Sequence, residues 1–236
     1  MKGDGGSARE HLALALDLDD LVAAIRMARP LAAYFSVAKV GLELFSAAGP
    51  ESVVALTRAG FRVFLDLKLH DIPTTVRRSA RVLGALGVSY ATVHTCGGLA
   101  MVEAATVGMA DGAASAGLPP PCVLGVTVLT SDSEASPDEL ARRTAVAANG
   151  GCGGVVCAAS DLGVVSAAAP RLLKVVPGIR PSRVAVDDQA RVATPAEAVR
   201  AGADLLVIGR AVTASADPEA AARSVVEEVA AEMGNT

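Results

Sequence analysis

Residues 64–76 read FLDLKLHDIPTTV, a segment that starts as an apolar strand and then departs from that pattern. Asp66, Lys68 and Asp71 stand among leucine, isoleucine and phenylalanine, where a core strand would carry no charge. Side chains alternate along a strand, so Phe64, Asp66 and Lys68 share one face and the leucines share the other. We therefore expect the leucines to pack against helices and the two charges to face an interior near the end of the strand.

Strand-like segments of this kind alternate with helical segments eight times along the chain. Most are continuously apolar, as strands covered on both faces of a parallel sheet must be. They are residues 11–18, 35–42, 62–69, 90–95, 122–129, 154–159, 172–178 and 205–209. This alternation predicts an α/β fold, a single-domain (β/α)8 TIM barrel over residues 11–236, after a flexible tail of residues 1–10. An open doubly wound sheet is the alternative, but no G-x-G-x-x-G motif follows the first strand.

Several helix starts carry recognisable signals. SPDE from Ser136 and TPAE from Thr194 combine an N-cap, a proline and a capping-box glutamate, and DPE from Asp217 repeats part of that pattern. The segment 76–86 is amphipathic. Its apolar stripe consists of Val76, Ala80, Leu83 and Leu86. We expect helices to follow each of these signals.

Composition excludes several function classes. Aromatic residues make up 3% of the chain, tryptophan is absent and the net charge is −4 without a basic block, which argues against a nucleic-acid partner. No run approaches 18 apolar residues, so no membrane span is expected, and the polar N-terminus does not resemble a signal peptide. The four cysteines form no C-x-x-C pair, which favours free buried thiols over disulfides or zinc. We expect a soluble cytoplasmic protein.

Polar residues mark the carboxyl ends of the predicted strands, where (β/α)8 barrels place their active sites. Asp17 ends the first strand, Lys39 lies near the end of the second, and Asp66 and Lys68 end the third. The fourth, fifth, seventh and eighth strands end in VHT, LTS, PGIR and IGR. A buried ion pair that holds the barrel together is the alternative, but desolvation makes such pairs weak stabilisers. A functional charged cluster is the better interpretation.

The segments after the seventh and eighth strands predict a phosphate site, because barrels often bind phosphate there. Arg180 can bind a phosphate in bidentate fashion, and the backbone N–H groups of Gly209 and Arg210 can point at its oxygens. The alternative is that Gly178 and Gly209 are ordinary turn residues and that the arginines are solvated.

The motif DLKLHDIPTTV resembles the D-x-K-x-x-D-I-P-x-T-V signature of orotidine 5′-phosphate decarboxylases. The flanking segments LALD, KVGLELF, VHTCGG, GVTVLTS, VVPGIRP, DDQARVATPAEA and GADLLVIGRAVT also match that family, in order along the chain. The resemblance is to the short bacterial type. It implies a carboxy-lyase that converts orotidine 5′-phosphate to UMP and CO2, the last step of de novo UMP biosynthesis, with no cofactor and no metal.

The resemblance also implies catalytic roles. Lys68 would protonate C6 of the pyrimidine, Asp66 would lie against the substrate carboxylate, and Lys39 would bridge the ribose and the charged array. Asp71 and Thr75 would reach into the site of a neighbouring subunit, which implies an obligate homodimer with shared active sites.

Substrate-binding roles follow from the same resemblance. They fall to Asp17 at the ribose, Thr130 at the pyrimidine edge, and Arg180, Gln189, Gly209 and Arg210 at the 5′-phosphate. Residues 181–188 would form a closing loop. Asp187 stands where the family usually has glycine, and we expect this carboxylate to alter the conformation of that loop or to weaken phosphate affinity, without changing the assigned reaction. His94 and His70 are expected to be structural hydrogen-bonding residues.

Two other functions stay open from the sequence. A magnesium-dependent sugar-phosphate decarboxylase, such as one acting on 3-keto-gulonate 6-phosphate, shares D-x-K-x-x-D but uses an acidic residue where Lys39 stands, and a protonated lysine cannot ligate a divalent cation. A non-catalytic phosphate-binding barrel is the alternative outside enzymes. It would be expected to lack one of the charged residues, and this chain has all of them.

Overall fold

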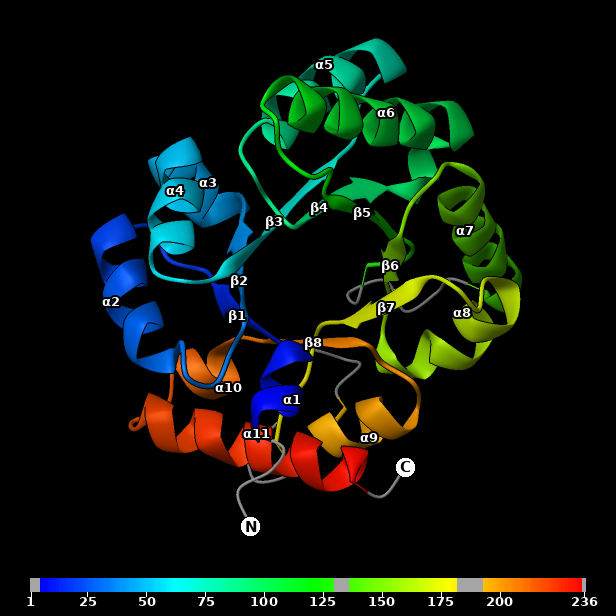
Figure 1. Cartoon of the computed structure of the whole chain (residues 1–236). Coiled ribbons are helices and arrows are strands. Elements are labelled where there is room, and N and C mark those ends of the chain that lie inside the picture. Colours follow the sequence, from blue (N-terminus) through cyan, green and yellow to red (C-terminus); the bar gives the residue numbers. More distant parts are fainter. Residues whose placement is uncertain (1–4, 130–135, 182–192, 235–236) are drawn as a thin grey trace.

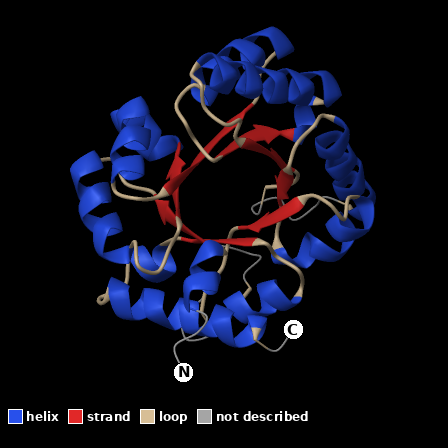
Figure 2. Ribbon diagram, in the orientation of Figure 1, coloured by secondary structure: helices blue, strands red, loops and turns tan. Residues whose placement is uncertain are grey.

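The computed structural model describes residues 5–129, 136–181 and 193–234, and nothing is said of the structure of the others. Eight parallel strands form a closed barrel in chain order, with β1 also pairing with β8 (Figures 1 and 2). They are β1 Leu12–Leu16, β2 Val37–Gly41, β3 Arg62–Leu69, β4 Tyr90–His94, β5 Cys122–Val126, β6 Gly154–Val156, β7 Leu173–Val176 and β8 Leu205–Ile208. All eight predicted strands and the predicted barrel are confirmed.

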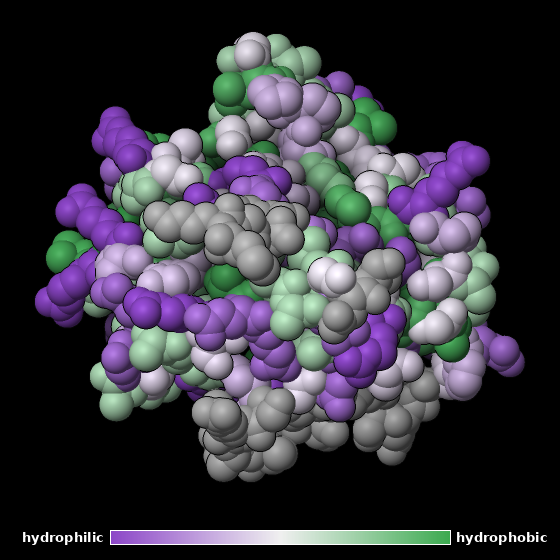
Figure 3. Space-filling model, turned by 60° about the horizontal axis from the view of Figure 1, so that its bottom comes forward, coloured by the Kyte–Doolittle hydropathy of each residue, from purple (hydrophilic) through white to green (hydrophobic). Residues whose placement is uncertain are grey.

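Helices surround the barrel on its outer side (Figure 2). In the described ranges they are α1 Gly5–Glu10, α2 Leu21–Leu31, α3 Leu42–Ala48, α4 Pro50–Arg58, α5 Pro73–Gly84, α6 Leu99–Ser115, α7 Pro137–Asn149, α8 Leu162–Ala168, α9 Pro195–Arg200, α10 Arg210–Thr213 and α11 Pro218–Met233. Within those ranges, no helix has both the length and the apolar character that a membrane crossing requires. On the face shown in Figure 3, hydrophilic and hydrophobic residues are interspersed.

The helix signals of the sequence are confirmed in the structure. The side chains of Ser136, Thr194 and Asp217 each accept a hydrogen bond from a backbone N–H in the first turn of α7, α9 and α11, respectively. Thr194 also completes a reciprocal capping box with Glu197. In α5, the predicted stripe is buried through Leu83. Caps satisfy backbone donors that would otherwise be orphaned, which is why these short signals set helix starts reliably.

Two apolar layers hold the barrel together. The outer faces of the strands pack against the helices, and the inner faces form a separate cluster inside the barrel. Ala15, Val37 and Phe64 belong to this inner cluster, and each precedes a charged residue of the predicted site by two positions. Because side chains two positions apart share a strand face, Asp17 and Asp66 lie on the inner face of the barrel, directly above the inner apolar cluster.

Part of the segment expected to be a flexible tail, residues 5–10, is helical. Residues 1–4 lie outside the described part of the chain, but Gly5–Glu10 form helix α1. Ala8 is fully buried in the outer apolar layer, and α1 packs against α11. A polar, glycine-rich composition has a low propensity to form a helix by itself. This segment is helical because it packs against α11, a helix from the other end of the chain.

The cysteines are free, but not all are buried. Cys152 and Cys157 are buried, Cys122 is half-buried, and Cys96 is exposed in the turn after β4, which corrects the expectation for that residue. Burial raises the pKa of Cys122 to about 11 and the pKa values of Cys152 and Cys157 to about 12. These three thiols are therefore protonated and unreactive at neutral pH.

Candidate active site

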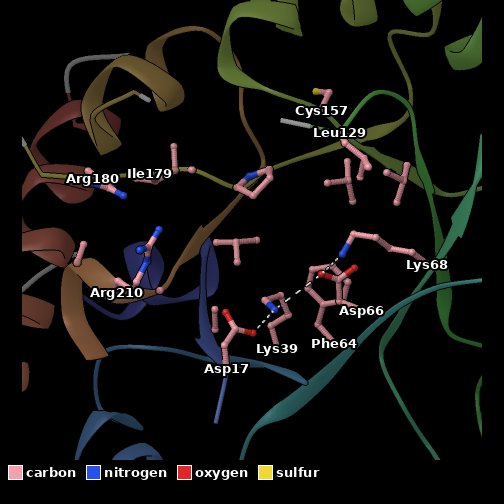
Figure 4. A pocket seen from close by; sticks show the side chains of 18 of the residues that line it. Asp17, Lys39, Phe64, Asp66, Lys68, Leu129, Cys157, Ile179, Arg180 and Arg210 are labelled. Atoms are coloured by element: carbon pink, nitrogen blue, oxygen red, sulfur yellow. Dashed lines mark hydrogen bonds and ion pairs between the residues drawn. The ribbon is translucent and has the colours of Figure 1, made fainter. Parts of the chain in front are cut away.

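A cavity of about 230 Å³ opens at the carboxyl ends of the strands. Most of the residues predicted for the site line it. They are Asp17, Lys39, Asp66, Lys68, Arg180, Gly209 and Arg210. Apolar residues such as Phe64, Leu129 and Ile179 complete the wall (Figure 4). The cavity therefore combines opposite charges with a partly dry surface, as ligand sites usually do.

Lysines and aspartates alternate along one side of this cavity. Lys39 Nζ lies 2.9 Å from Asp17 Oδ1 and 3.7 Å from Asp66 Oδ2, and Lys68 Nζ lies 2.8 Å from Asp66 Oδ2 (Figure 4). The side chains of Lys39 and Asp66 are only 10% and 12% exposed, whereas that of Lys68 is 31% exposed. Holding four charges here costs desolvation energy that a purely structural role would not repay. The arrangement is one expected of a functional site.

Strand register brings these residues together. Gly41, at the end of β2, is the cross-strand partner of Asp66 in β3, and Lys39 is the partner of Ala15, two residues before Asp17. A Cβ atom at position 41 would lie 3.0 Å from Asp17 Oδ1 and 3.1 Å from Lys39 Nζ. The lack of a side chain at Gly41 thus leaves the space in which the Lys39 ammonium and the Asp17 carboxylate meet.

We expect Gly41→Ala to lower kcat/KM for the expected substrate, orotidine 5′-phosphate, about tenfold. The added methyl group would displace the Lys39 ammonium by a few tenths of an ångström from the carboxylates of Asp17 and Asp66. Steady-state kinetics on the purified variant measures the change. Gly163→Ala is the matched control, since a Cβ there meets no atom within 4 Å and the residue lies in α8, away from the cavity. Full activity of Gly41→Ala would show that the array tolerates this displacement.

Strand β3 is not regular where the charges stand. The predicted inward direction of Asp66 and Lys68 is confirmed, since both line the cavity. However, the pairing of β3 with β4 shifts register between Leu65 and Leu69, and Lys68 has a left-handed backbone with φ of 52°. Simple alternation predicted the right face, but it missed this bulge.

Thr92 of β4 is a site residue that the sequence interpretation did not identify. Its hydroxyl donates to Asp66 Oδ1 at 3.1 Å and accepts from the backbone N–H of Lys68 at 2.8 Å. Thr92 is 1% exposed. The sequence did contain a signal for Thr92, because it is a polar residue within the apolar strand YATVH. It lies two positions after Tyr90 and therefore on the same strand face, and Tyr90 packs against the inner cluster.

The two arginines of the predicted phosphate site lie across the cavity from the lysines (Figure 4). Arg180 follows β7 and is 8% exposed, and Arg210 begins α10 directly after β8. Gly178 takes φ of 74°, a value that disfavours other residues, so it is needed for the turn that carries Arg180. Two guanidinium groups at one end of a cavity suit a dianion such as a phosphate monoester.

Other predicted residues are not brought to this cavity. Asp71 and Thr75 are exposed at the start of α5 and are not among the described residues that line it, and Asp71 Oδ1 accepts a hydrogen bond from the Ile72 N–H. Thr130 and Gln189 lie outside the described residues. The same holds for Asp187 and for all but the first residue of the predicted closing loop 181–188.

His94 and His70 lie near the lysine end of the site, with ring centroids 5.5 Å apart. In the described part of the chain, His94 Nδ1 is buried without a hydrogen-bond partner, so the expected structural hydrogen bond is not seen at that atom. Burial lowers the pKa of His94, and electrostatic interactions with His70, Lys68 and Arg143 lower it further, against the opposing effect of Asp66. His94 is therefore neutral at pH 7.

Fold and site together define a class of protein. It is a (β/α)8 barrel enzyme in which an array of aspartates and lysines faces an anion-binding site formed by Arg180 and Arg210. Among the described residues, no group of three or more histidine, cysteine or acidic side chains is placed to hold a metal ion. Residues 10–225 match the model of the orotidine 5′-phosphate decarboxylase / HUMPS family. The chain belongs to that family.

Individual relatives agree with this assignment. The chain is 48% identical over 227 residues to the orotidine 5′-phosphate decarboxylase of Anaeromyxobacter sp. (strain K), covering 92% of this chain and 96% of that relative. It is 43% identical to the Moorella thermoacetica enzyme of the same name, covering 94% and 93% of the two chains. A crystal structure of orotidine 5′-phosphate decarboxylase from Lactobacillus acidophilus superposes with a TM-score of 0.78 at 33% identity, covering 93% of this chain and 99% of that one.

Proposed function

We propose that this chain decarboxylates orotidine 5′-phosphate to UMP and CO2, the last step of de novo UMP formation, in the cytoplasm and without a metal or organic cofactor. One arrangement supports this function above all. Lys68 and Lys39 flank the half-buried Asp66 on one side of the cavity, and Arg180 and Arg210 lie on the other. In a nucleotide with a carboxylate at one end and a phosphate at the other, the carboxylate would lie beside the lysines and the phosphate beside the arginines.

Decarboxylation at C6 leaves a vinyl carbanion with no cofactor to receive its charge. The barrier reduction required is roughly 20 kcal/mol or more, near the upper range for enzymes. The Lys68 ammonium would stabilise the developing charge at C6 and then donate the proton that forms UMP. Its 2.8 Å contact with Asp66 holds the ammonium in place before substrate arrives, so little reorganisation is needed during the reaction.

Asp66 would lie against the carboxylate that leaves as CO2. Two like charges about 4 Å apart repel by about 4 kcal/mol at an effective dielectric constant of about 20, so repulsion alone falls far short of the barrier reduction. Charge stabilisation by Lys68 must therefore contribute most of the rate. Lys39, which contacts both Asp17 and Asp66, would link the ribose hydroxyls to the charged array.

The rest of the substrate would be bound at a distance from C6. Arg180, Arg210 and the backbone at Gly209 would hold the 5′-phosphate, together with Gln189, and Thr130 would contact the pyrimidine edge. Phosphate binding can be used to close the site around the substrate, so binding energy far from C6 is expressed as catalysis.

Asp71 and Thr75 would complete the site of a second subunit in a homodimer. Both are exposed on this chain, beside Ile72, whose exposed fraction is 65%. Leu42 and Leu99 are also exposed, at the helix starts after β2 and β4. Because β2, β3 and β4 are neighbours in the barrel, these exposed apolar residues follow neighbouring strands at the same rim, as expected of a surface that a partner covers.

The test is a spectrophotometric assay of the purified chain with orotidine 5′-phosphate in the presence of EDTA. We expect the orotate absorbance to fall as UMP forms, at the same rate with and without added Mg²⁺. Turnover that requires Mg²⁺ would instead favour a sugar-phosphate type of chemistry, which needs an acidic metal ligand where Lys39 stands. No consumption under either condition would contradict the proposed function.

A further inference from the structure

Thr92 joins the two charged residues of β3 from the neighbouring strand. Its single hydroxyl makes two hydrogen bonds: it donates to the Asp66 carboxylate and accepts from the Lys68 backbone N–H. Thr92 is 1% exposed, so water is not positioned to replace it. A buried group that loses such a partner stays unsatisfied, which makes these bonds consequential for the local geometry.

The bond to Lys68 occurs where β3 departs from regular structure. Lys68 is the only non-glycine residue with positive φ among the described residues, at 52°. A side-chain-bearing residue adopts this conformation only when surrounding contacts favour it. In a regular parallel pair, the Lys68 N–H would bond to a backbone carbonyl of a neighbouring strand, but here it bonds to the Thr92 hydroxyl inside the register shift between Leu65 and Leu69.

The bond to Asp66 sets the rotation of the carboxylate. Both lysine ammonium groups approach Oδ2, at 2.8 Å from Lys68 and 3.7 Å from Lys39, while Thr92 binds Oδ1. The two oxygens are thus held in different directions, one toward the cavity cations and the other toward β4. Without the hydroxyl, the carboxylate could turn about its Cβ–Cγ bond and carry the Lys68 ammonium with it.

We propose that Thr92 is a positioning residue, which places the Lys68 ammonium and the Asp66 carboxylate for reaction at C6 by holding the β3 bulge and the carboxylate rotation together. This inference rests on the proposed function. It concerns the chemical step rather than substrate binding, because the Thr92 hydroxyl bonds to Asp66 and to the Lys68 backbone, and Thr92 is not among the described residues that line the cavity.

The test compares Thr92→Val, which keeps the shape but lacks the hydroxyl, with Thr92→Ser, which keeps the hydroxyl. We expect Thr92→Val to lower kcat about a hundredfold, the effect typical of a displaced catalytic group, while the KM for orotidine 5′-phosphate and the Kd for UMP change by less than about threefold. Thr92→Ser should retain kcat within about fivefold of the unmodified chain. Thr144→Val is the matched control, because Thr144 is equally buried but its hydroxyl bonds to the Leu140 carbonyl within α7.

Three results would overturn the positioning role: an unchanged kcat in Thr92→Val, an equal loss in Thr92→Ser, or a loss of UMP affinity in proportion to the loss of kcat. If circular dichroism shows that Thr92→Val does not fold, Thr92→Ala takes its place. The expected result is the same: kcat falls while the affinity for UMP stays nearly unchanged. Failure of the proposed function is distinct, since the unmodified chain would then not consume orotidine 5′-phosphate at all.

Discussion

Lys68→Ala is expected to lower turnover of orotidine 5′-phosphate by about 10⁵-fold or more. A positioned general acid contributes roughly 10²–10⁴ in rate and a preorganised charge at the reacting atom roughly 10²–10³, and Lys68 would supply both. The substitution also leaves Asp66 without its 2.8 Å ion pair, so that a carboxylate with 12% exposure faces the substrate carboxylate less well neutralised. The measurement is kcat from the absorbance assay with EDTA present.

Lys174→Ala is the matched control for this experiment. Lys174 also pairs with an aspartate, Asp204, at 3.6 Å, but it lies at the start of β7, at the end of the barrel opposite the cavity. We expect that variant to keep kcat within about twofold, because an ion pair away from the site contributes little to chemistry. Retention of more than about 1% of turnover by Lys68→Ala would rule out its role as the proton donor.

Asp71→Ala is expected to lower kcat/KM about a thousandfold, although Asp71 does not line the cavity of its own chain. The reason is that its carboxylate would complete the charged array of the partner subunit. Mixing Asp71→Ala with Lys68→Ala under conditions of subunit exchange should then restore activity. Half of the dimers would be mixed and each would contain one intact site, so about a quarter of unmodified activity should return.

Asp138→Ala is the control for a lost surface carboxylate, since Asp138 is exposed in the first turn of α7, remote from the start of α5. Asp138→Ala should keep its activity. A mixture of Asp138→Ala and Lys68→Ala should show only the activity that the Asp138→Ala subunits contribute by themselves. If Asp71→Ala is inactive but the mixture recovers nothing, Asp71 acts within its own chain. A fully active monomer, measured by sedimentation at assay concentrations, would remove the need for a shared site altogether.

Much of the fold could be predicted from the sequence because its signals are local. Continuously apolar strands report burial on both faces, and capping residues such as Ser136 and Thr194 satisfy donors within three residues of themselves. The charged residues at strand ends followed from the same logic, since parallel strands bring their carboxyl ends to one rim. Asp17, Lys39, Asp66 and Lys68 do meet there.

Other features depend on contacts between distant segments and were missed for that reason. Helix α1 is ordered by α11, although its composition is that of a tail. Cys96 is exposed because it lies in the turn Thr95–Gly97, two positions after the end of β4, and not in the strand itself.

The sequence by itself determined that FLDLKL forms a barrel strand and that its two charges face the interior, since alternation of side chains is a local property of the strand. Only the tertiary structure decided how those charges are held. The left-handed backbone of Lys68 and the orientation of Asp66 both depend on the hydroxyl of Thr92, 24 residues from Lys68 on another strand. A hydrogen bond across strands has no signature in the spacing of residues within one of them, because register is set only when the strands pair.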